Sequence, residues 1–197
     1  MISTSRGKLH LKQPKANAIA ERQIGVALDG IRAILCSAGL PICFWPFAGH
    51  ALSFNDCCNK KGKVSSAYET LMHNNNVHKD DERAIAPPAF KMPKTYVPGQ
   101  LVFYKPAPTI RSLPKCAHPL RAGIFLDYYI FPDGKFSQQY IVVDLEDFRF
   151  TNLHERSGAN NFKLRLHRTE VVHDPRYTVE PIFPLLERYR SANYSLE

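Results

Sequence analysis

The sequence predicts an α+β fold in which helices come first and a small antiparallel β-barrel or curled sheet follows. In the first part of the chain, apolar residues recur every three or four positions, the period of an amphipathic helix. From residue 100 onward, short β-branched and aromatic runs are bounded by turn residues, which is typical of antiparallel strands. Most of the fifteen prolines stand after residue 86, which favours short strands and loops there.

The first helix is expected to run from about residue 17 to residue 38. Asn17 is the expected N-cap, and Gly39-Leu40-Pro41 is the expected stop. Gly25 and Gly30 each cost about 1 kcal/mol relative to alanine, so this helix depends on tertiary packing. Its expected packing stripe consists of Ala20, Ile24, Ala27, Leu28, Ile31, Ile34, Leu35 and Ala38.

Two further helices are expected before the chain changes character. One runs from about Ile42 to Cys58 and is apolar over a wide arc, so deep burial is expected. A shorter one covers Ser66–His73. The chain is thus divided into helices at 10–75, a polar linker at 76–89, a β unit at 90–150 and a C-terminal extension at 151–197.

The β unit contains three strand-like runs, and Pro132-Asp133-Gly134-Lys135 is an expected turn between two of them. Residues 162–172 are expected to add one or two strands, and residues 184–190 a short helix. Tyr104 stays open between core and surface. The expected core residues are Phe103, Ile124, Leu126 and Val142. The three runs are Gln100–Tyr104, Ala122–Leu126 and Gln139–Asp144.

The chain is basic, with 26 Lys and Arg against 18 Asp and Glu and a formal charge of +8. Such a surplus raises the local concentration of polyanions and fits a nucleic-acid partner. A basic protein without such a partner is the alternative. The cations gather in an acid-free N-terminal segment and in a cluster near residue 60. The expected nucleic-acid contacts there are Lys12, Lys15, Lys60, Lys61 and Lys63.

The five cysteines form no Cys-x-x-Cys pair, so no metal site is predicted. Small apolar side chains on helix faces, in a reduced intracellular setting, are the favoured interpretation. No apolar run reaches about 20 residues, so no membrane partner is expected. The basic first residues also fit a mitochondrial transit peptide, and this alternative stays open.

The run Asn17-Ala18-Ile19-Ala20-Glu21-Arg22, followed by Leu40-Pro41 and Phe44-Trp45, resembles the end of the RNase H-like catalytic core of copia-type retrotransposon integrases. In that family the glutamate completes an Asp, Asp, Glu triad, and Glu21 takes its place. Residues 1–20 contain no Asp or Glu, so the two family aspartates that help to hold the metals have no counterpart before Glu21. The resemblance implies a catalytic relic that uses no cofactor alone, and Mg²⁺ or Mn²⁺ only in a completed site.

The same resemblance marks Arg22 and Arg32, which match basic positions of the family and are candidates for contacts with DNA phosphates. Solvated helix faces, or an ion pair with Asp29, are the alternative. Two departures from the family argue against activity in the same way as the missing aspartates. Ala18 stands where the family has Gly, and Gly25 stands where it often has a basic residue.

A second resemblance lies in the β unit. Gly123-Ile124-Phe125-Leu126-Asp127-Tyr128 is similar to a segment of the SH3-like domain that follows the integrase core in copia-type Pol polyproteins. Asp127 replaces the family's glycine, so a close backbone contact or bend is expected to be lost. Basic residues here stand beside Tyr96, Phe103 and Tyr104, which either stack on bases or fill the core. These basic residues are Lys94, Lys105, Arg111, Lys115 and Arg121.

The leading functional hypothesis is a fragment of a retrotransposon Pol polyprotein, catalytically inactive alone, with residual affinity for DNA and, by resemblance, a nuclear location. A protein-interaction module built on the SH3-like unit, prone to self-association, is the second hypothesis. A strand transferase completed by another Pol-derived chain is the third. An upstream reading frame that encoded the two missing Asp residues would restore an integrase.

Overall fold

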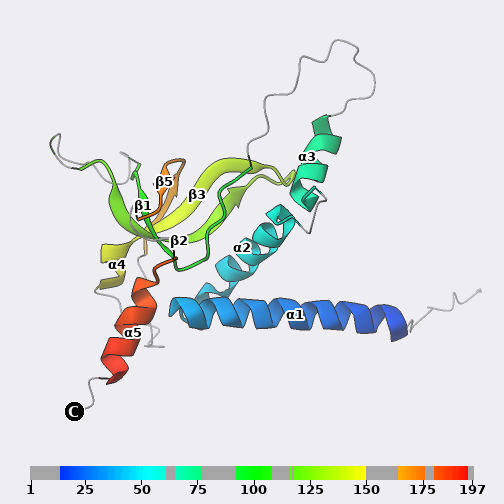
Figure 1. The fold of residues 1–197 in the computed structure, drawn as a ribbon, viewed down its shortest axis with the longest axis horizontal. Coiled ribbons are helices and arrows are strands. Elements are labelled where there is room, and N and C mark those ends of the chain that lie inside the picture. Colours follow the sequence, from blue (N-terminus) through cyan, green and yellow to red (C-terminus); the bar gives the residue numbers. More distant parts are fainter. Residues whose placement is uncertain are drawn as a thin grey trace, which may run out of the picture.

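The computed structural model describes residues 14–60, 65–76, 92–107, 116, 118–149, 164–175 and 180–194. They form helices that pack against a curled antiparallel sheet, so the α+β class is confirmed (Figure 1). The helices are α1 (Pro14–Ala38), the 3₁₀ turn η1 (Ile42–Phe44), α2 (Trp45–Cys58), α3 (Ala67–Asn76), α4 (Leu145–Arg149) and α5 (Pro184–Tyr194). The strands are β1 (Leu101–Tyr104), β2 (Arg121–Ile130), β3 (Phe136–Asp144), β4 (Leu166–Thr169) and β5 (Val172–His173).

The ends of α1 explain its position in the sequence. The helix begins at Pro14, so the predicted N-cap at Asn17 is wrong. Proline suits a first helical position because its fixed φ is already helical and it has no N–H to satisfy. The predicted stop is confirmed, since Gly39 has a φ of +65° and Leu40 N donates to Leu35 O at 3.0 Å. This pairing closes the helix with a Schellman motif.

The third helix begins with a reciprocal cap. Glu69 N donates to Ser66 Oγ at 3.1 Å, and Ser66 N donates to Glu69 Oε2 at 3.0 Å. This capping box satisfies two backbone N–H groups that a helix start leaves unpaired. It fixes the start of the short helix that the sequence predicted here.

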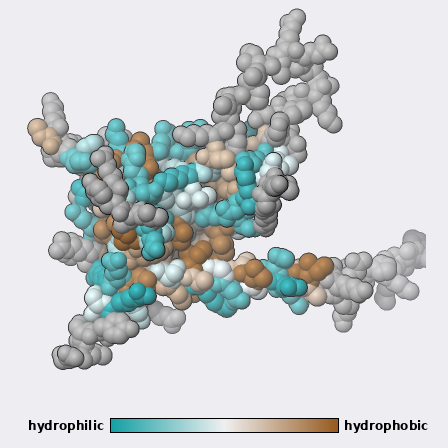
Figure 2. All heavy atoms as spheres, viewed as in Figure 1, coloured by the Kyte–Doolittle hydropathy of each residue, from teal (hydrophilic) through white to brown (hydrophobic). Residues whose placement is uncertain are grey.

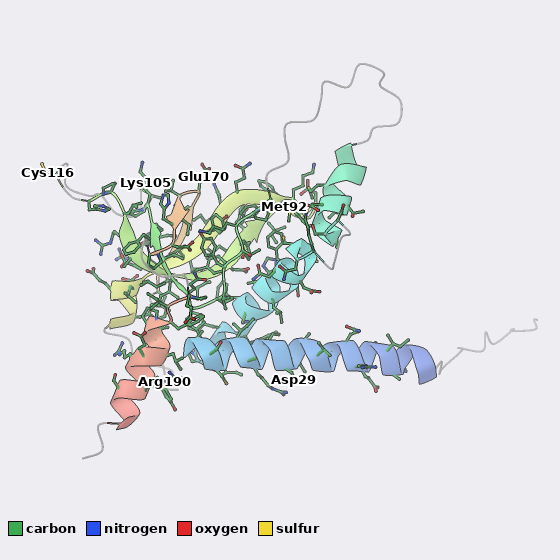
Figure 3. All side chains as sticks on the ribbon, viewed as in Figure 1. Asp29, Met92, Lys105, Cys116, Glu170 and Arg190 are labelled. Carbon is green, nitrogen blue, oxygen red and sulfur yellow. The ribbon has the colours of Figure 1, made fainter. Side chains whose placement is uncertain are left out.

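The five strands are ordered β4-β3-β2-β1-β5. The two edge strands are separated in the chain by Glu170 and Val171 alone, so one segment crosses from one edge of the sheet to the other. At this corner Thr169 Oγ1 donates to Lys105 O at 3.0 Å, and Figure 3 shows Lys105 and Glu170 on the same side of the sheet. Among the described strands no ladder joins β4 to β5, so the sheet is curled but open, and the expected closed barrel is not formed.

The turn predicted between β2 and β3 is confirmed. Gly134 has a φ of +82°, a left-handed conformation that favours glycine. Phe131 N donates to Lys135 O, and Gly134 N donates to Phe131 O, both at 2.9 Å. The predicted strands near residues 162–172 and the terminal helix correspond to β4, β5 and α5.

Both faces of β2 are buried, each in a cluster that helices and strands share. The inner cluster lies against α2 and α3, and the outer cluster lies against α1, α2, α4 and α5. The inner cluster contains Ala51, Phe54, Cys58, Tyr68, Met72, Tyr96, Val102, Tyr104, Phe125, Tyr128, Tyr140 and Val142. The outer cluster contains Leu35, Ala38, Leu40, Phe44, Ala48, Ile124, Leu126, Val143, Phe148 and Leu185.

These shared clusters join the helices and the sheet into one packed body. The boundaries drawn from the sequence stay a prediction, since most of the proposed linker lies outside the described residues. The expected core residues Ile124, Leu126 and Val142 are fully buried, as is Tyr104. Phe103 is only partly buried, because it alternates with Val102 and Tyr104 along the short strand β1.

Candidate functional site

The sequence-predicted site residues do not converge in the structure. Glu21 and Arg22 are exposed on the half of α1 that projects away from the body (Figure 1). Arg32 forms an exposed ion pair with Asp29 at 2.9 Å, as the alternative interpretation expected. Lys60 pairs with Glu69 at 3.0 Å, beyond the end of α2. Lys12, Lys61 and Lys63, and the side chain of Lys15, lie outside the described residues.

No metal-binding group of side chains is found among the residues that the structure describes. Within these residues, no group of three or more His, Cys, Asp or Glu side chains could hold an ion. Over the same residues, no helix combines the length and the apolar character needed to cross a membrane. Glu21 stands on the solvent side of a helix, where a single carboxylate could supply only part of a hydrated ion's shell.

The apolar stripe of α1 is divided between packed and open surface. Its C-terminal part is covered, with Leu35 and Ala38 in the outer cluster. Its N-terminal part is open, with Ile24 59% and Leu28 44% exposed. Figure 2 shows hydrophobic spheres along the projecting part of the helix. The open apolar surface therefore lies in the N-terminal half of α1.

The aromatic residues that the sequence placed beside cations in the β unit are mostly core. Tyr96 and Tyr104 are buried in the inner cluster, so neither offers a ring face to a ligand. Two of the neighbouring cations are paired as well, while Lys105 is exposed after β1. Arg121 donates to Asp144 at 2.9 Å and to Glu146 at 2.6 Å, and Lys94 pairs with Asp174. Arg111 and Lys115 lie outside the described residues.

Asp127, which stands where the resemblance predicts a glycine, joins the sheet to α2. Both of its carboxylate oxygens lie 2.8 Å from His50 Nδ1, and Tyr128 N donates to Oδ1 at 2.8 Å. Burial raises the pKa of Asp127 above its ordinary value, against the lowering effect of these hydrogen bonds. A register shift between Phe125 and Asp127 marks a β-bulge here. The local bend expected to be lost is thus present, with the carboxylate turned toward α2.

A second group of side chains lies beyond this bulge, at the far end of β2. The guanidinium of Arg168, on β4, lies 4.0 Å from the centroid of the Tyr129 ring. Phe131 lies edge-on to Tyr129 with ring centroids 5.8 Å apart, and it is 47% exposed. Sequence reasoning missed this group. Tyr129 and Phe131 were visible at a strand end, but nothing local could link them to Arg168.

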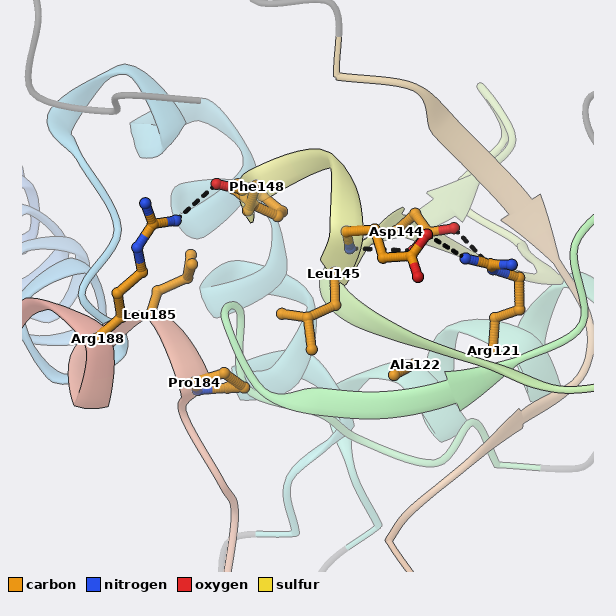
Figure 4. A pocket seen from close by; sticks show the side chains of 9 residues that line it. Arg121, Ala122, Asp144, Leu145, Phe148, Pro184, Leu185 and Arg188 are labelled. Carbon is orange, nitrogen blue, oxygen red and sulfur yellow. Dashed lines mark hydrogen bonds and ion pairs between the residues drawn. The ribbon is translucent and has the colours of Figure 1, made fainter. Parts of the chain in front are cut away.

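One cleft lies between the start of β2, α4 and α5, with a volume of about 650 Å³ (Figure 4). Its floor is apolar, and the Arg121–Asp144–Glu146 ion pairs close one end. At the other end Arg188 Nη1 donates to Phe148 O at 2.7 Å, near the end of α4. Because Arg121, Asp144 and Glu146 are paired with one another and Arg188 donates to a backbone oxygen, the cleft offers shape more than free polar groups. Its apolar lining consists of Ala122, Leu145, Phe148, Pro184 and Leu185.

Comparison with known proteins adds no constraint to this picture. No protein-family model, no curated protein and no solved structure matches the chain. The described residues offer three features: an open apolar helix stripe, a small aromatic and cationic surface at one end of the sheet, and an open cleft. The first two can bind macromolecules, and neither is a complete catalytic centre.

Proposed function

We propose that the chain derives from the Pol polyprotein of a copia-type retrotransposon. In this proposal, residues 14–76 are the last helices of an RNase H-like integrase core, and the curled sheet is the SH3-like domain that follows. The chain does not carry out strand transfer alone, because Glu21 is one of the three carboxylates that the chemistry needs. It keeps an affinity for DNA.

The observation that carries this proposal is the divided stripe of α1. Leu35 is buried and Leu28 is 44% exposed, although both belong to one continuous apolar face. An RNase H-like core packs its helices against a central sheet, so a helix taken from it is expected to present apolar surface where that sheet is absent. Glu21 lies on this open half, next to Ala20 and Ile24.

The strand order supports the SH3-like part. Strands β1 to β4 pair in chain order, and β5 returns to pair with β1. This is the order expected for an SH3-like domain, with the corner at Glu170 and Val171 in the place of the last connection.

The affinity for DNA is supported by charge. The formal charge is +8, and Arg22 projects from α1 without an ion pair among the described residues. A protein that neutralises phosphates with such cations releases bound counterions, so its binding weakens as salt is added. The chain as a whole can therefore attract a polyanion even though its predicted contacts are spread over several elements.

A fluorescence titration of the full chain against labelled duplex and single-stranded DNA tests the proposal. We expect a dissociation constant tighter than about 1 μM at low salt, and a linear fall of log K with log salt. Absence of binding, or binding that salt does not change, contradicts it. Mg²⁺- or Mn²⁺-dependent strand transfer that is lost in Glu21→Gln would instead support a transferase completed by a partner chain.

A second candidate function, a protein-interaction module, is favoured by the same open stripe. Surface such as that of Ile24 and Leu28 drives association when it is large enough and continuous. In this function α1, rather than the sheet, is the contact, and a second copy of the chain is the simplest partner to test.

Size-exclusion chromatography with light scattering separates this second candidate from the first. If α1 mediates association, the measured mass rises with concentration, and Ile24→Glu returns it to that of one chain. Gln23→Glu is the matched control, because it adds the same charge one position away from the stripe. A mass of one chain at all concentrations contradicts the interaction function.

A further inference from the structure

We infer that Tyr129, Phe131 and Arg168 form a binding surface for the unpaired bases of single-stranded nucleic acid. We call this group the Tyr129 surface. The inference rests on the proposed affinity for nucleic acid, and it adds the site and the form of the strand. None of the three residues belongs to the candidates that the sequence suggested.

The sheet itself brings these side chains together. Asp127 on β2, Ile141 on β3 and Arg168 on β4 are successive partners across the sheet, so their side chains share one face. Tyr129 lies two residues beyond Asp127 and therefore on the same face. The contact between its ring and the guanidinium, 4.0 Å from the ring centroid, follows from this row.

The Tyr129 surface is both rigid and open. The backbone of Phe131 is held at both its N–H and its C=O in the β2–β3 turn, by 2.9 Å bonds to Lys135 and Gly134. Its ring is nevertheless 47% exposed, and it packs edge-on to Tyr129. An aromatic ring with an open face can stack on a base, and because its backbone is already held, binding restricts only the ring itself.

The charge of the Tyr129 surface favours a polyanion. Arg168 forms no ion pair among the described residues, so its charge is available to a phosphate. Its guanidinium plane covers one face of Tyr129 and is itself a surface on which a base can stack. The acids of this region are Asp133, which pairs with Lys135 at 3.4 Å, and Glu170, which lies 3.5 Å from Gln139 Nε2. Asp127, in the same row, is buried and pairs with His50 at 2.8 Å.

Base stacking determines whether the Tyr129 surface prefers single-stranded or double-stranded nucleic acid. In a duplex the bases are stacked on one another, so exposed protein rings cannot reach their faces. A cationic surface without aromatic rings would bind both forms through phosphates alone. The combination of Phe131 and Arg168 therefore predicts a preference for a single strand over the duplex of the same sequence.

Fluorescence anisotropy with a labelled single strand of about 20 nucleotides of mixed sequence, and with its duplex, tests the inference. We expect Phe131→Leu, which keeps an apolar side chain but removes the ring, to weaken single-strand binding about tenfold and duplex binding less than about twofold. Arg168→Lys keeps the charge and removes the planar group. We expect it to weaken single-strand binding several-fold, about as much as stacking on one base contributes, with an unchanged salt slope.

Two exposed residues of α5 supply the controls. Tyr189→Leu removes an exposed ring, and Arg190→Lys makes the same change to an exposed cation, both on another element. We expect each to leave both affinities within about twofold of the parent chain.

The outcomes separate the inference from the proposed function. If the parent chain binds DNA and Phe131→Leu changes nothing, the Tyr129 surface is not the site, while the DNA affinity stands. If Phe131→Leu weakens single-strand and duplex binding equally, stacking is not the mode of binding, and the inference is overturned. If the parent chain binds neither form, both the inference and the proposed affinity fail.

Discussion

The two halves of α1 have the same sequence pattern and opposite surroundings. From Ile31 to Ala38 the apolar stripe packs into the outer cluster and approaches α5. From Ala20 to Leu28 the same stripe continues with the same spacing, but its side chains are exposed. Periodicity thus determines which face of a helix is apolar, while the elements that pack against that face decide how much of it is buried.

This contrast has an energetic side. A helix of about 12 to 15 residues is marginal in water without packing. The open half of α1 also contains Gly25, where an added Cβ would meet nothing within 4 Å. Its stability therefore depends on continuity with the packed half, which makes the two halves separable by substitution.

The largest expected effect contrasts two leucines of one helix. Leu35→Ala removes a side chain that is 5% exposed, and we expect a loss of about 2–5 kcal/mol in the free energy of unfolding. Leu28→Ala, at 44% exposure, is expected to cost less than about 0.5 kcal/mol. Urea unfolding followed by circular dichroism measures both, and equal losses would mean that the open half is covered.

The next largest effect is expected at Gly99, which precedes β1 and packs against the C-terminal end of α1. Gly99 has a φ of +90°, and a Cβ there would lie 2.3 Å from Ala38 Cβ. Gly99→Ala therefore combines backbone strain with a clash, and we expect a loss of at least about 1–3 kcal/mol. The same unfolding experiment measures it. An unchanged urea midpoint would show that the turn at Gly99 and α1 do not approach each other this closely.

The His50–Asp127 pair gives a pH-dependent effect. Burial raises the pKa of Asp127 above 3.8, so its contribution to stability is present below that value and is lost as the pH rises through the raised pKa. His50→Leu leaves a buried carboxylate with Tyr128 N–H as its remaining hydrogen-bond donor. We expect a loss of about 1–3 kcal/mol near neutral pH, and a smaller loss near pH 4, where more of the carboxyl is protonated.

The control for this pair is His173→Leu, at an exposed position on β5. It removes an exposed imidazole for which the described contacts give no carboxylate partner, so its effect is expected to change little between the two pH values. If His50→Leu lowers the free energy of unfolding equally at both pH values, His50 does not stabilise the ionised carboxylate of Asp127.

The smallest expected effect has the opposite sign. Gly25→Ala replaces an interior helix glycine where there is room for a methyl group, and we expect a gain of about 0.5–1 kcal/mol. The gain is expected to appear as a higher urea midpoint. A destabilised Gly25→Ala would show that something packs against this face of α1.

Local signals made much of this fold predictable, and long-range pairing made the rest unpredictable. The stop at Gly39 and the turn at Gly134 follow from glycines that adopt positive φ. The sharing of two clusters between helices and strands does not, because hydrophobic patterns name a buried face and not its partner. The His50–Asp127 contact spans 77 positions, and no local spacing could suggest it.

The candidate site shows the same limit. Glu21 and Arg22 were chosen by motif, and their exposed places on α1 neither add to nor remove that resemblance. Tyr104 was left open, and it is buried because its side of β1 faces the inner cluster. Tyr129 and Arg168 come into contact through the register of β2, β3 and β4. This register could not be predicted from the sequence.

Hydrogen exchange along α1, in dilute monomeric protein, tests most directly the claim that half of this helix lacks its cover. We expect the amides of residues 31–38 to exchange near the rate set by global unfolding, and those of residues 20–28 to exchange much faster through local opening. Equal, strong protection along the whole helix would contradict the claim. It would mean that the free chain already buries the stripe on which the proposed ancestry depends.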